Sequence, residues 1–231
     1  MDIQDKVALI TGASRGLGRA VAETMGAAGA QVIAVARTVG GLEEVDDAIR
    51  AAGGPGAVLV PLDITDDPGL SRLGAAIHER WGRLDIWVHS AVAAPMLSPA
   101  EHIEADQMDL AGAVNVIALQ RLIRALDPLL RQSPAGRAVF LDDPIEPDAF
   151  NAVYCAGKAG QRVLAEAWGK GIAQTTPARV IHALAPPMPT GLRAKWFPGE
   201  DRSSLTPPAL VAQRLLCALA GDADGVVDLR E

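Results

Sequence analysis

A tyrosine and a lysine stand four residues apart in the segment VYCAGKAG, at Tyr154 and Lys158. In a helix this spacing places both side chains on one face. A nearby ammonium group favours tyrosinate, and a tyrosine with a lowered pKa can exchange a proton with a carbonyl or an alcohol near neutral pH. The same spacing also fits two surface neighbours, but Tyr154 is the only tyrosine in the chain. We therefore expect this pair to carry proton transfer.

A glycine-spaced turn follows an apolar strand near the start of the chain, in VALITGASRGLGR. Gly12, Gly16 and Gly18 fall where the backbone turns tightly and lets a phosphate approach. The helix that follows directs its free N–H groups and the positive end of its dipole at that phosphate. Glycine-rich turns are common, but here a strand precedes, a helix follows and a second strand, QVIAVAR, comes next. This order predicts a dinucleotide-binding βαβ unit.

Strand-like apolar runs alternate with helical patterns along the whole chain, as expected of an α/β protein. The runs are apolar on successive residues, which indicates a doubly wound parallel sheet of about seven strands covered on both faces. The predicted strands are Val7–Ile10, Val32–Ala36, Val58–Pro61, Ile86–His89, Ala138–Leu141, Val180–Leu184 and Val226–Leu229. The predicted helices are Leu17–Ala28, Gly41–Ala52, Pro68–Trp81, Ala105–Arg131, Phe150–Ala173 and Pro207–Ala220.

The composition fits one domain over residues 1–231, because the chain has 231 residues and 49% of them are hydrophobic. A net charge of -7 gives no electrostatic footprint for nucleic acid or an anionic membrane, so we expect a small-molecule partner. The sequence starts without a signal-peptide pattern and has no window apolar enough to cross a bilayer. Cys155 and Cys217 lack metal-ligand spacing. We expect a cytoplasmic protein without a metal.

The spacing G-x-x-x-G-x-G, together with the later Tyr-x-x-x-Lys pair, resembles the signature of the short-chain dehydrogenase/reductase family. The resemblance implies a single Rossmann-type domain that transfers hydride between a nicotinamide cofactor and a carbonyl or secondary alcohol. It implies that Tyr154 donates or accepts the proton, while Lys158 binds the nicotinamide ribose and lowers the pKa of the tyrosine. It also implies that Asn115, in GAVNVIAL, holds a water in the proton relay. On the residues alone, Asn115 could instead bond its own helix backbone.

The resemblance further places Asp63 at the adenine amino group and Thr190 at the nicotinamide carboxamide, although Asp63 alone could start a turn. The second strand ends at Arg37, where NAD binders present an acid. Arg15 lies inside the glycine turn, and two guanidinium groups suit the 2′-phosphate of NADP(H). Either arginine alone could be a surface residue. The residues expected at the cofactor are Gly12, Ser14, Arg15, Gly16, Leu17, Gly18, Arg37, Asp63, Ile64, Ser90, Ala91, Tyr154, Lys158 and Thr190.

The chain departs from the family pattern where a serine is expected, about a dozen residues before the tyrosine. The segment AVFLDDPIEPDAFNAVY contains no Ser or Thr, and the position falls on Asp142 or Asp143. An ionised aspartate could not donate a hydrogen bond and would raise the pKa of the tyrosine, whereas a neutral one could donate in place of the serine. We take Asp142 as the candidate for that role or for binding a cationic substrate. Alternatively, both acids cap the next loop and face water.

Two further departures concern the loops around the expected site. The segment His89 to Val92 reads HSAV where the family has NNAG, and we expect His89 to be a satisfied interior histidine. Pro186–Leu205 is a proline-rich segment in which Pro187 replaces a family glycine, and it is expected to lie over the carboxyl edge of the sheet as a substrate loop. Trp196 and Phe197 could form an apolar lid there, or merely pack the loop down.

The sequence leaves three hypotheses for function. We expect an NADP(H)-dependent oxidoreductase because Tyr154, Lys158 and Asn115 are retained. The missing serine motivates the second hypothesis, a cofactor-binding protein that has lost reductase chemistry and acts as a sensor or subunit. The third is a non-redox lyase or isomerase that uses the same tyrosine. The two long helices, 105–131 and 150–173, carry more apolar surface than one sheet face should cover, so we also expect self-association.

Overall fold

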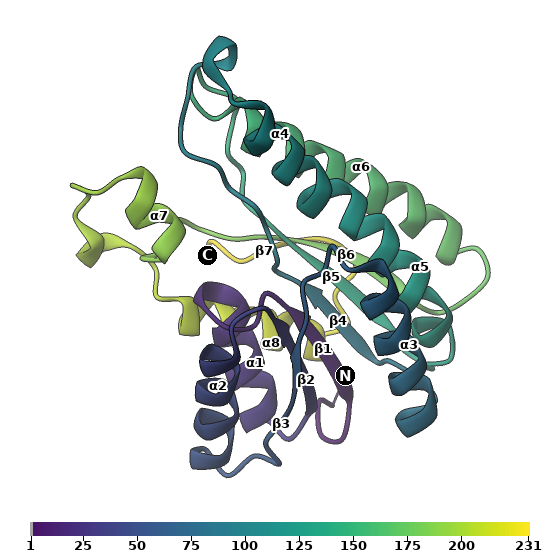
Figure 1. Ribbon diagram of the computed structural model, residues 1–231. Helices are drawn as coiled ribbons and strands as arrows, with labels where there is room; N and C mark the ends of the chain where they lie inside the picture. Colours follow the sequence, from purple (N-terminus) through teal and green to yellow (C-terminus); the bar gives the residue numbers. More distant parts are fainter. Residues whose placement is uncertain (1) are drawn as a thin grey trace.

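The computed structural model describes residues 2–231, and within them seven strands form one sheet. The strands pair in parallel in the order β3-β2-β1-β4-β5-β6-β7 (Figure 1). This arrangement confirms the predicted doubly wound α/β fold. The strands are β1 Val7–Thr11, β2 Gln31–Ala36, β3 Ala57–Pro61, β4 Ile86–His89, β5 Arg137–Asp142, β6 Arg179–Leu184 and β7 Gly225–Asp228.

Helices cover both faces of the sheet in two layers, each closing its own hydrophobic core (Figure 1). One layer holds α1 Gly16–Ala27, α2 Val39–Ala51 and α8 Pro208–Ala220. The other holds α3 Asp67–Trp81, α4 Ala105–Gly112, α5 Ala118–Arg131 and α6 Ala152–Ile172. Consecutive apolar residues in the inner strands therefore meet apolar side chains on both sides.

Burial differs between the inner and the outer strands. Every residue of β1, β4 and β5 is buried, as expected for strands with helices on both faces. The edge strands β3 and β7 are only partly covered, and Val226 is 67% exposed. The prediction that all strands are covered on both faces is therefore wrong at the two edges, because the helix layers do not fully cover the outer strands.

The predicted helix Ala105–Arg131 is interrupted in the structure. A π-helical segment, Ala113–Ile117, separates α4 from α5. At its centre the amide of Asn115 accepts a hydrogen bond from Ala93 N and donates one to Ala93 O, each 2.8 Å long. The wider turn holds Asn115 against the loop that follows β4, a contact between residues far apart in the sequence. Such π turns are frequent at functional sites.

Two loops project from the carboxyl edge of the sheet and lie side by side (Figure 1). They are residues 90–104, which follow β4, and residues 143–151, which follow β5; Ser98 N donates to Phe150 O at 2.9 Å. The predicted substrate segment Pro186–Leu205 contains a short helix, α7 Gly191–Trp196, beside them. No helix in residues 2–231 is long and apolar enough to cross a bilayer.

The close packing of α1 against the sheet gives a first prediction. A Cβ at Gly18 would overlap the carbonyl oxygen of Gly12 and lie 2.9 Å from Ser90 Oγ, whereas a Cβ at Gly40 in α2 would meet nothing within 4 Å. Gly18→Ala should lower the free energy of unfolding by roughly 1–3 kcal/mol because backbone must move. Gly40→Ala should raise it by about 0.4–1 kcal/mol. Denaturant titration measures both, and equal effects would contradict the packing.

Candidate active site

The glycine turn between β1 and α1 is shaped for close approach by another backbone. Gly12 and Gly16 have φ of +73° and +59°, a left-handed conformation that favours glycine. A Cβ on Gly12 would lie 2.8 Å from Ala91 N, and one on Gly16 would lie 3.6 Å from the methyl group of Thr190. The structure thus brings together the turn, Ser90, Ala91 and Thr190, which are distant in sequence.

The start of α1 is open to an anion. No side chain caps its first N–H groups, and Arg15, at the N-cap position, is exposed. These N–H groups and the helix dipole can bind a phosphate. Because the glycines leave room that a Cβ would fill, the residues present fit the pyrophosphate of a dinucleotide. Of the other residues expected here, Leu17 and Ile64 are buried in the hydrophobic cores, and Ser14 packs beside Gly41.

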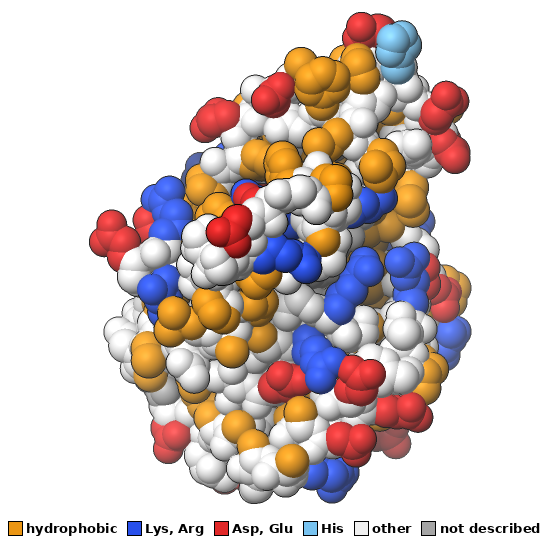
Figure 2. Space-filling view, turned by 90° about the vertical axis from the view of Figure 1, so that its left-hand side faces the viewer, with side chains coloured by type: hydrophobic (Ala, Val, Ile, Leu, Met, Phe, Trp, Pro, Cys, Tyr) orange, Lys and Arg blue, Asp and Glu red, His pale blue; other side chains and the backbone are white. Residues whose placement is uncertain are grey.

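Arg37 and Asp63 lie together after β2 and β3. Arg37 Nη1 is 3.7 Å from Asp63 Oδ2, and the Arg37 side chain is 68% exposed. Asp63 Oδ1 accepts from Thr65 N at 2.9 Å and from Thr65 Oγ1 at 2.8 Å. Partial burial would raise the pKa of Asp63, but the Thr65 hydrogen bonds and Arg37 outweigh it and lower that pKa. On the face of the molecule that Figure 2 shows, Lys and Arg side chains gather near the middle.

The hydroxyl group of Tyr154, near the start of α6, contacts the carboxylate of Asp143. The two oxygens of Asp143 lie 2.9 Å and 3.1 Å from Tyr154 Oη, and Tyr154 is only 4% exposed. Burial, and then the negative charge of Asp143, raise the pKa of Tyr154 above its usual value. The net direction is opposite to the lowered tyrosine pKa that the family resemblance implies. The expected effect of an aspartate at the serine position, a raised tyrosine pKa, is confirmed.

Lys158 lies on the same face of α6 as Tyr154, as the spacing predicts, but it binds elsewhere. Its Nζ donates to Leu141 O at 2.8 Å, and lies 3.8 Å from Asp142 Oδ1 and 5.9 Å from the centroid of the Tyr154 ring. The charged group that bonds to the tyrosine hydroxyl is therefore Asp143, whereas Lys158 bonds to the backbone.

Asp142 is buried and turned away from the tyrosine hydroxyl. Its Oδ2 accepts from Arg162 Nε at 3.1 Å, and its Oδ1 accepts from Asp143 N at 3.0 Å and lies near Lys158. This geometry contradicts the alternative that both acids face water, and it places Asp143 instead of Asp142 at the tyrosine. Sequence reasoning missed Arg162, although its position four residues after Lys158 puts it on the same side of α6.

Asn115 lies next to α6 with both polar atoms of its side chain occupied by the peptide of Ala93. A Cβ on Gly157 would lie 2.6 Å from Asn115 Nδ2, so the glycine in α6 allows this approach. The alternative that Asn115 bonds its own helix backbone is wrong, because its partner lies in the loop after β4. The side chain fixes that loop against the helix that carries Tyr154 and Lys158.

His89 is an interior histidine, as predicted. It is 2% exposed, its Nδ1 lies 2.9 Å from Thr11 Oγ1 and its Nε2 lies 3.2 Å from Gln161 Nε2. An amide nitrogen only donates, so Nε2 accepts and Nδ1 carries the proton. Burial and the nearby Lys158 charge lower the pKa of His89 to about 3. The neutral ring therefore links β1, β4 and α6 beneath the site.

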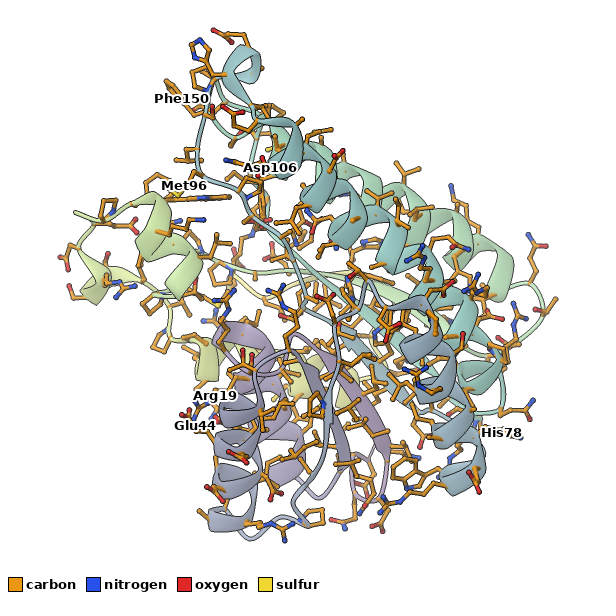
Figure 3. All side chains as sticks on the ribbon, in the orientation of Figure 1. Arg19, Glu44, His78, Met96, Asp106 and Phe150 are labelled. Atoms are coloured by element: carbon orange, nitrogen blue, oxygen red, sulfur yellow. The ribbon has the colours of Figure 1, made fainter. Side chains whose placement is uncertain are left out.

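A small apolar pocket opens above Tyr154, between the projecting loops and α7. Its apolar lining is Pro95, Met96, Leu97, Ile103, Phe150, Val153 and Trp196, and its polar lining is Ser98, Gln107, Asn151 and Tyr154. The ring of Trp196 meets the Tyr154 ring edge-on, with centroids 4.9 Å apart, and its N–H donates to Pro95 O at 2.9 Å. Figure 3 shows Met96 beside α7 and Phe150 at the tip of the projecting loops. Phe197, by contrast, is 42% exposed.

Comparison with known proteins agrees with this geometry. Residues 6–201 match the family model described as short chain dehydrogenase. The chain belongs to the short-chain dehydrogenase family. Its curated relatives within that family include the ketoacyl reductase HetN of Nostoc sp., 32% identical over 67% of this chain and 54% of the relative. Another is the 3-oxoacyl-[acyl-carrier-protein] reductase FabG of Salmonella typhimurium, 31% identical over 69% of this chain and 64% of the relative. The match thus spans less than two thirds of either relative.

Solved short-chain dehydrogenases match the whole fold. One from Pseudomonas syringae superposes with a TM-score of 0.92 at 27% identity, covering 99% of this chain and 96% of the other. A dehydrogenase from Shigella flexneri, complexed with NADP, has a TM-score of 0.91 at 28% identity over 99% and 98% of the two chains. One from Escherichia coli CFT073, complexed with NADPH, has 0.91 at 27% identity over 100% and 99%. These structures support a nicotinamide cofactor of the short-chain dehydrogenase kind.

The depressed pKa of His89 predicts how stability depends on pH. The unfolded ring has a pKa near 6.5 and the folded ring about 3, so the unfolded chain binds more protons between those values. The neutral ring therefore contributes fully to the free energy of unfolding above about pH 6.5. As the pH falls below this value, that contribution decreases by about 1.4 kcal/mol per pH unit. Burial also lowers the pKa of His182, so its contribution to the free energy of unfolding is likewise lost as the pH falls.

His89→Gln should therefore reduce the acid dependence of the unfolding free energy, whatever its effect on stability at neutral pH. His78→Gln is the matched control, because His78 is exposed. Urea unfolding at a series of pH values measures the slopes. A His89→Gln slope equal to that of the unmodified protein and of the control would contradict this account.

Proposed function

We propose that this protein is an NADP(H)-dependent oxidoreductase that acts on a carbonyl or a secondary alcohol. The observation that carries the proposal is the position of Tyr154, a buried hydroxyl group at the carboxyl edge of the sheet, facing an apolar pocket. Lys158 shares its helix face, and the glycine turn lies at the same edge. The family relatives are reductases and dehydrogenases, and this favours an oxidoreductase over a sensor or a non-redox enzyme.

In this proposal the nicotinamide, when bound, supplies or takes up the hydride. The N–H groups at the start of α1 and the turn at Gly12, Gly16 and Gly18 hold the pyrophosphate. Ser90, Ala91 and Thr190 line the path towards the nicotinamide end. Tyr154 exchanges a proton with the substrate oxygen, and Lys158 binds the ribose next to it. Asn115 holds the loop after β4 in place beside them.

The preference for NADP(H) rests on two arginines. Arg37 is exposed at the end of β2 and only loosely paired with Asp63, so its guanidinium group is available to a 2′-phosphate. Arg15 is exposed at the start of α1. In the same place an NAD binder presents an acidic side chain to the ribose hydroxyls. Two solved relatives are described as complexes with NADP or NADPH.

The apolar pocket favours a substrate with hydrocarbon substituents on its carbonyl carbon. Most of its lining is apolar and none of it is charged, although Ser98, Gln107 and Asn151 add polar groups. HetN and FabG are named as reductases of ketoacyl groups, whereas another relative is named sorbitol dehydrogenase. A mostly apolar, uncharged lining agrees better with a ketoacyl substrate than with a polyol. We propose residues 186–205 as the loop that closes over this substrate, because Trp196 already covers Tyr154.

Self-association through the helices 105–131 and 150–173 is also part of the proposal. Apolar side chains on this layer are exposed, among them Met108 and Leu110 of α4, Ile117 of the π segment and Val163 of α6, each about half exposed or more. A second copy packed on this face would bury them. Both cysteines are free, which suits a reducing compartment such as the cytoplasm.

Cofactor preference can be tested by fluorescence titration with NADPH and NADH. Arg37→Ser should weaken NADPH binding by about 10- to 100-fold, since a hydrogen bond between charged groups contributes about 1.5–3 kcal/mol. NADH binding should stay unchanged. The matched control is Arg72→Ser, an equally exposed arginine 3.4 Å from its own aspartate partner, Asp66. Equal affinities for NADPH and NADH in the unmodified protein would refute the assignment of Arg37.

The role of Tyr154 can be tested with ethyl 3-oxobutanoate as a probe ketone. Tyr154→Phe should lower kcat/KM for NADPH-dependent reduction by about 10²–10⁴-fold, because the acid that donates to the substrate oxygen is lost. NADPH affinity should change less than about twofold, since Phe keeps the ring packing. Full activity of the variant would sink the proposed mechanism.

A further inference from the structure

The proton that Tyr154 must exchange is engaged in a hydrogen bond to Asp143. Both carboxylate oxygens lie within 3.1 Å of Tyr154 Oη. An ionised carboxylate has no hydrogen to donate, so the tyrosine hydroxyl donates to it. While this bond persists, the hydroxyl proton points at Asp143 and not at a substrate in the pocket. A role for Tyr154 as proton donor must therefore include Asp143.

The ammonium group of Lys158 bonds to the backbone and not to the tyrosine hydroxyl. It donates to Leu141 O, and its nearest carboxylate is Asp142. Asp142 also pairs with Arg162, so these three charged groups compensate one another at the end of β5. The two adjacent carboxylates thus contact different residues of the same helix, α6. Asp142 balances the cations of α6, and Asp143 alone meets the tyrosine.

Asp143 is more accessible to water than the tyrosine that it contacts. Tyr154 is buried and the indole of Trp196 lies edge-on to its ring, which shields the hydroxyl from solvent. Asp143 is partly exposed at the start of the loop 143–151. The titratable and charged groups around it come from three elements: Asp142 on β5, Glu146 on its own loop, and Tyr154, Cys155, Lys158 and Arg162 on α6. From α7 it is Trp196 that faces the tyrosine.

We propose that Asp143 is the group behind Tyr154 that stores the exchanged proton, and that its protonation state determines whether the enzyme is in the form that oxidises an alcohol or in the form that reduces a carbonyl. This inference rests on the proposed function. In alcohol oxidation the substrate O–H bond breaks and its proton passes to Tyr154 Oη, while the tyrosine O–H proton passes to the Asp143 carboxylate. The two electrons leave the substrate carbon as hydride to the oxidised nicotinamide dinucleotide. Asp143 then releases its proton to water.

Carbonyl reduction is the same sequence reversed, and it starts from protonated Asp143. The carboxyl proton passes to Tyr154 Oη as the tyrosine proton passes to the substrate oxygen, and the reduced dinucleotide supplies the hydride. Asp143 ends as the carboxylate. Oxidation therefore uses ionised Asp143 and reduction uses the neutral acid, so acid favours reduction and base favours oxidation through the same group. Asp143 acts through Tyr154, and in this sense it is a positioning residue.

The first experiment needs no substrate, because the chain contains one tyrosine. The near-ultraviolet absorbance of tyrosinate follows Tyr154 alone during a pH titration of the purified protein, with circular dichroism recording folding at each pH. Asp143→Ser and Asp143→Asn remove the carboxylate, so Tyr154 should ionise at least about one pH unit lower than in the unmodified protein. Glu146→Gln removes a charge from the same loop without touching the tyrosine, and it should leave the titration unchanged.

Titrations of Asp143→Ser and Asp143→Asn that coincide with that of the unmodified protein would overturn the inference, including the case in which Tyr154 ionises in none of them before unfolding. A shift in Glu146→Gln as large as in Asp143→Asn would overturn it too, because general charge in the loop and not the bond to Asp143 would then hold the proton.

The second experiment measures kcat/KM against pH in both directions, with ethyl 3-oxobutanoate and NADPH, and with ethyl 3-hydroxybutanoate and NADP⁺. One ionisation should lower reduction and raise oxidation as the pH increases, and Asp143→Ser should lose it from both profiles. Retention of the same ionisation in Asp143→Ser overturns the role of Asp143. Absence of turnover in the unmodified protein, with the tyrosinate shift present, counts against the proposed function on this probe while the link between Asp143 and Tyr154 stands.

Discussion

All seven strands run parallel, and this constraint decides where chemistry can occur. Parallel pairing forces every chain segment that leaves a strand to leave it at the same edge. The glycine turn after β1, the loop after β4 and the aspartates after β5 therefore meet, although more than a hundred residues separate the first from the last. Between β1 and β4 the order of the sheet reverses direction. The crevice at this switch point is where open α/β sheets bind ligands.

Buried polar contacts then fix α6 on the sheet. Gln161 meets His89 of β4, Lys158 meets the carbonyl of Leu141 at the end of β5, and Arg162 meets Asp142. A buried polar group without a partner is costly, so each contact penalises any sliding of the helix. Tyr154, near the start of α6, thereby acquires a fixed position. The acid that touches it comes from the same strand end that anchors the helix.

The sequence was sufficient to predict the sheet, the turn at Gly12 to Gly18 and the shared face of Tyr154 and Lys158, because these follow from local periodicity and spacing. It was not sufficient to choose between Asp142 and Asp143. Asp142 is the last residue of β5 and Asp143 the first residue of the loop, and both contact α6. Which carboxylate reaches Tyr154 depends on the path of the backbone after the strand, and local spacing does not specify that path. The π turn at Asn115 was also out of reach, since its cause is a contact with Ala93 in another loop. The pKa of Tyr154 depends on which group Lys158 bonds to, and the four-residue spacing does not specify that group.

The indole of Trp196 lies against the ring of Tyr154, and its N–H is bonded to the carbonyl of Pro95. If residues 186–205 close over the substrate as proposed, a substrate that reaches the tyrosine must first displace this indole and break that bond. The apparent affinity for any substrate is then the intrinsic affinity multiplied by the fraction of molecules in which α7 has moved away. Weak observed binding would thus measure the stability of the covered state as much as the fit of the ligand, and a bulky apolar substituent that takes the place of the indole recovers part of the lost contact.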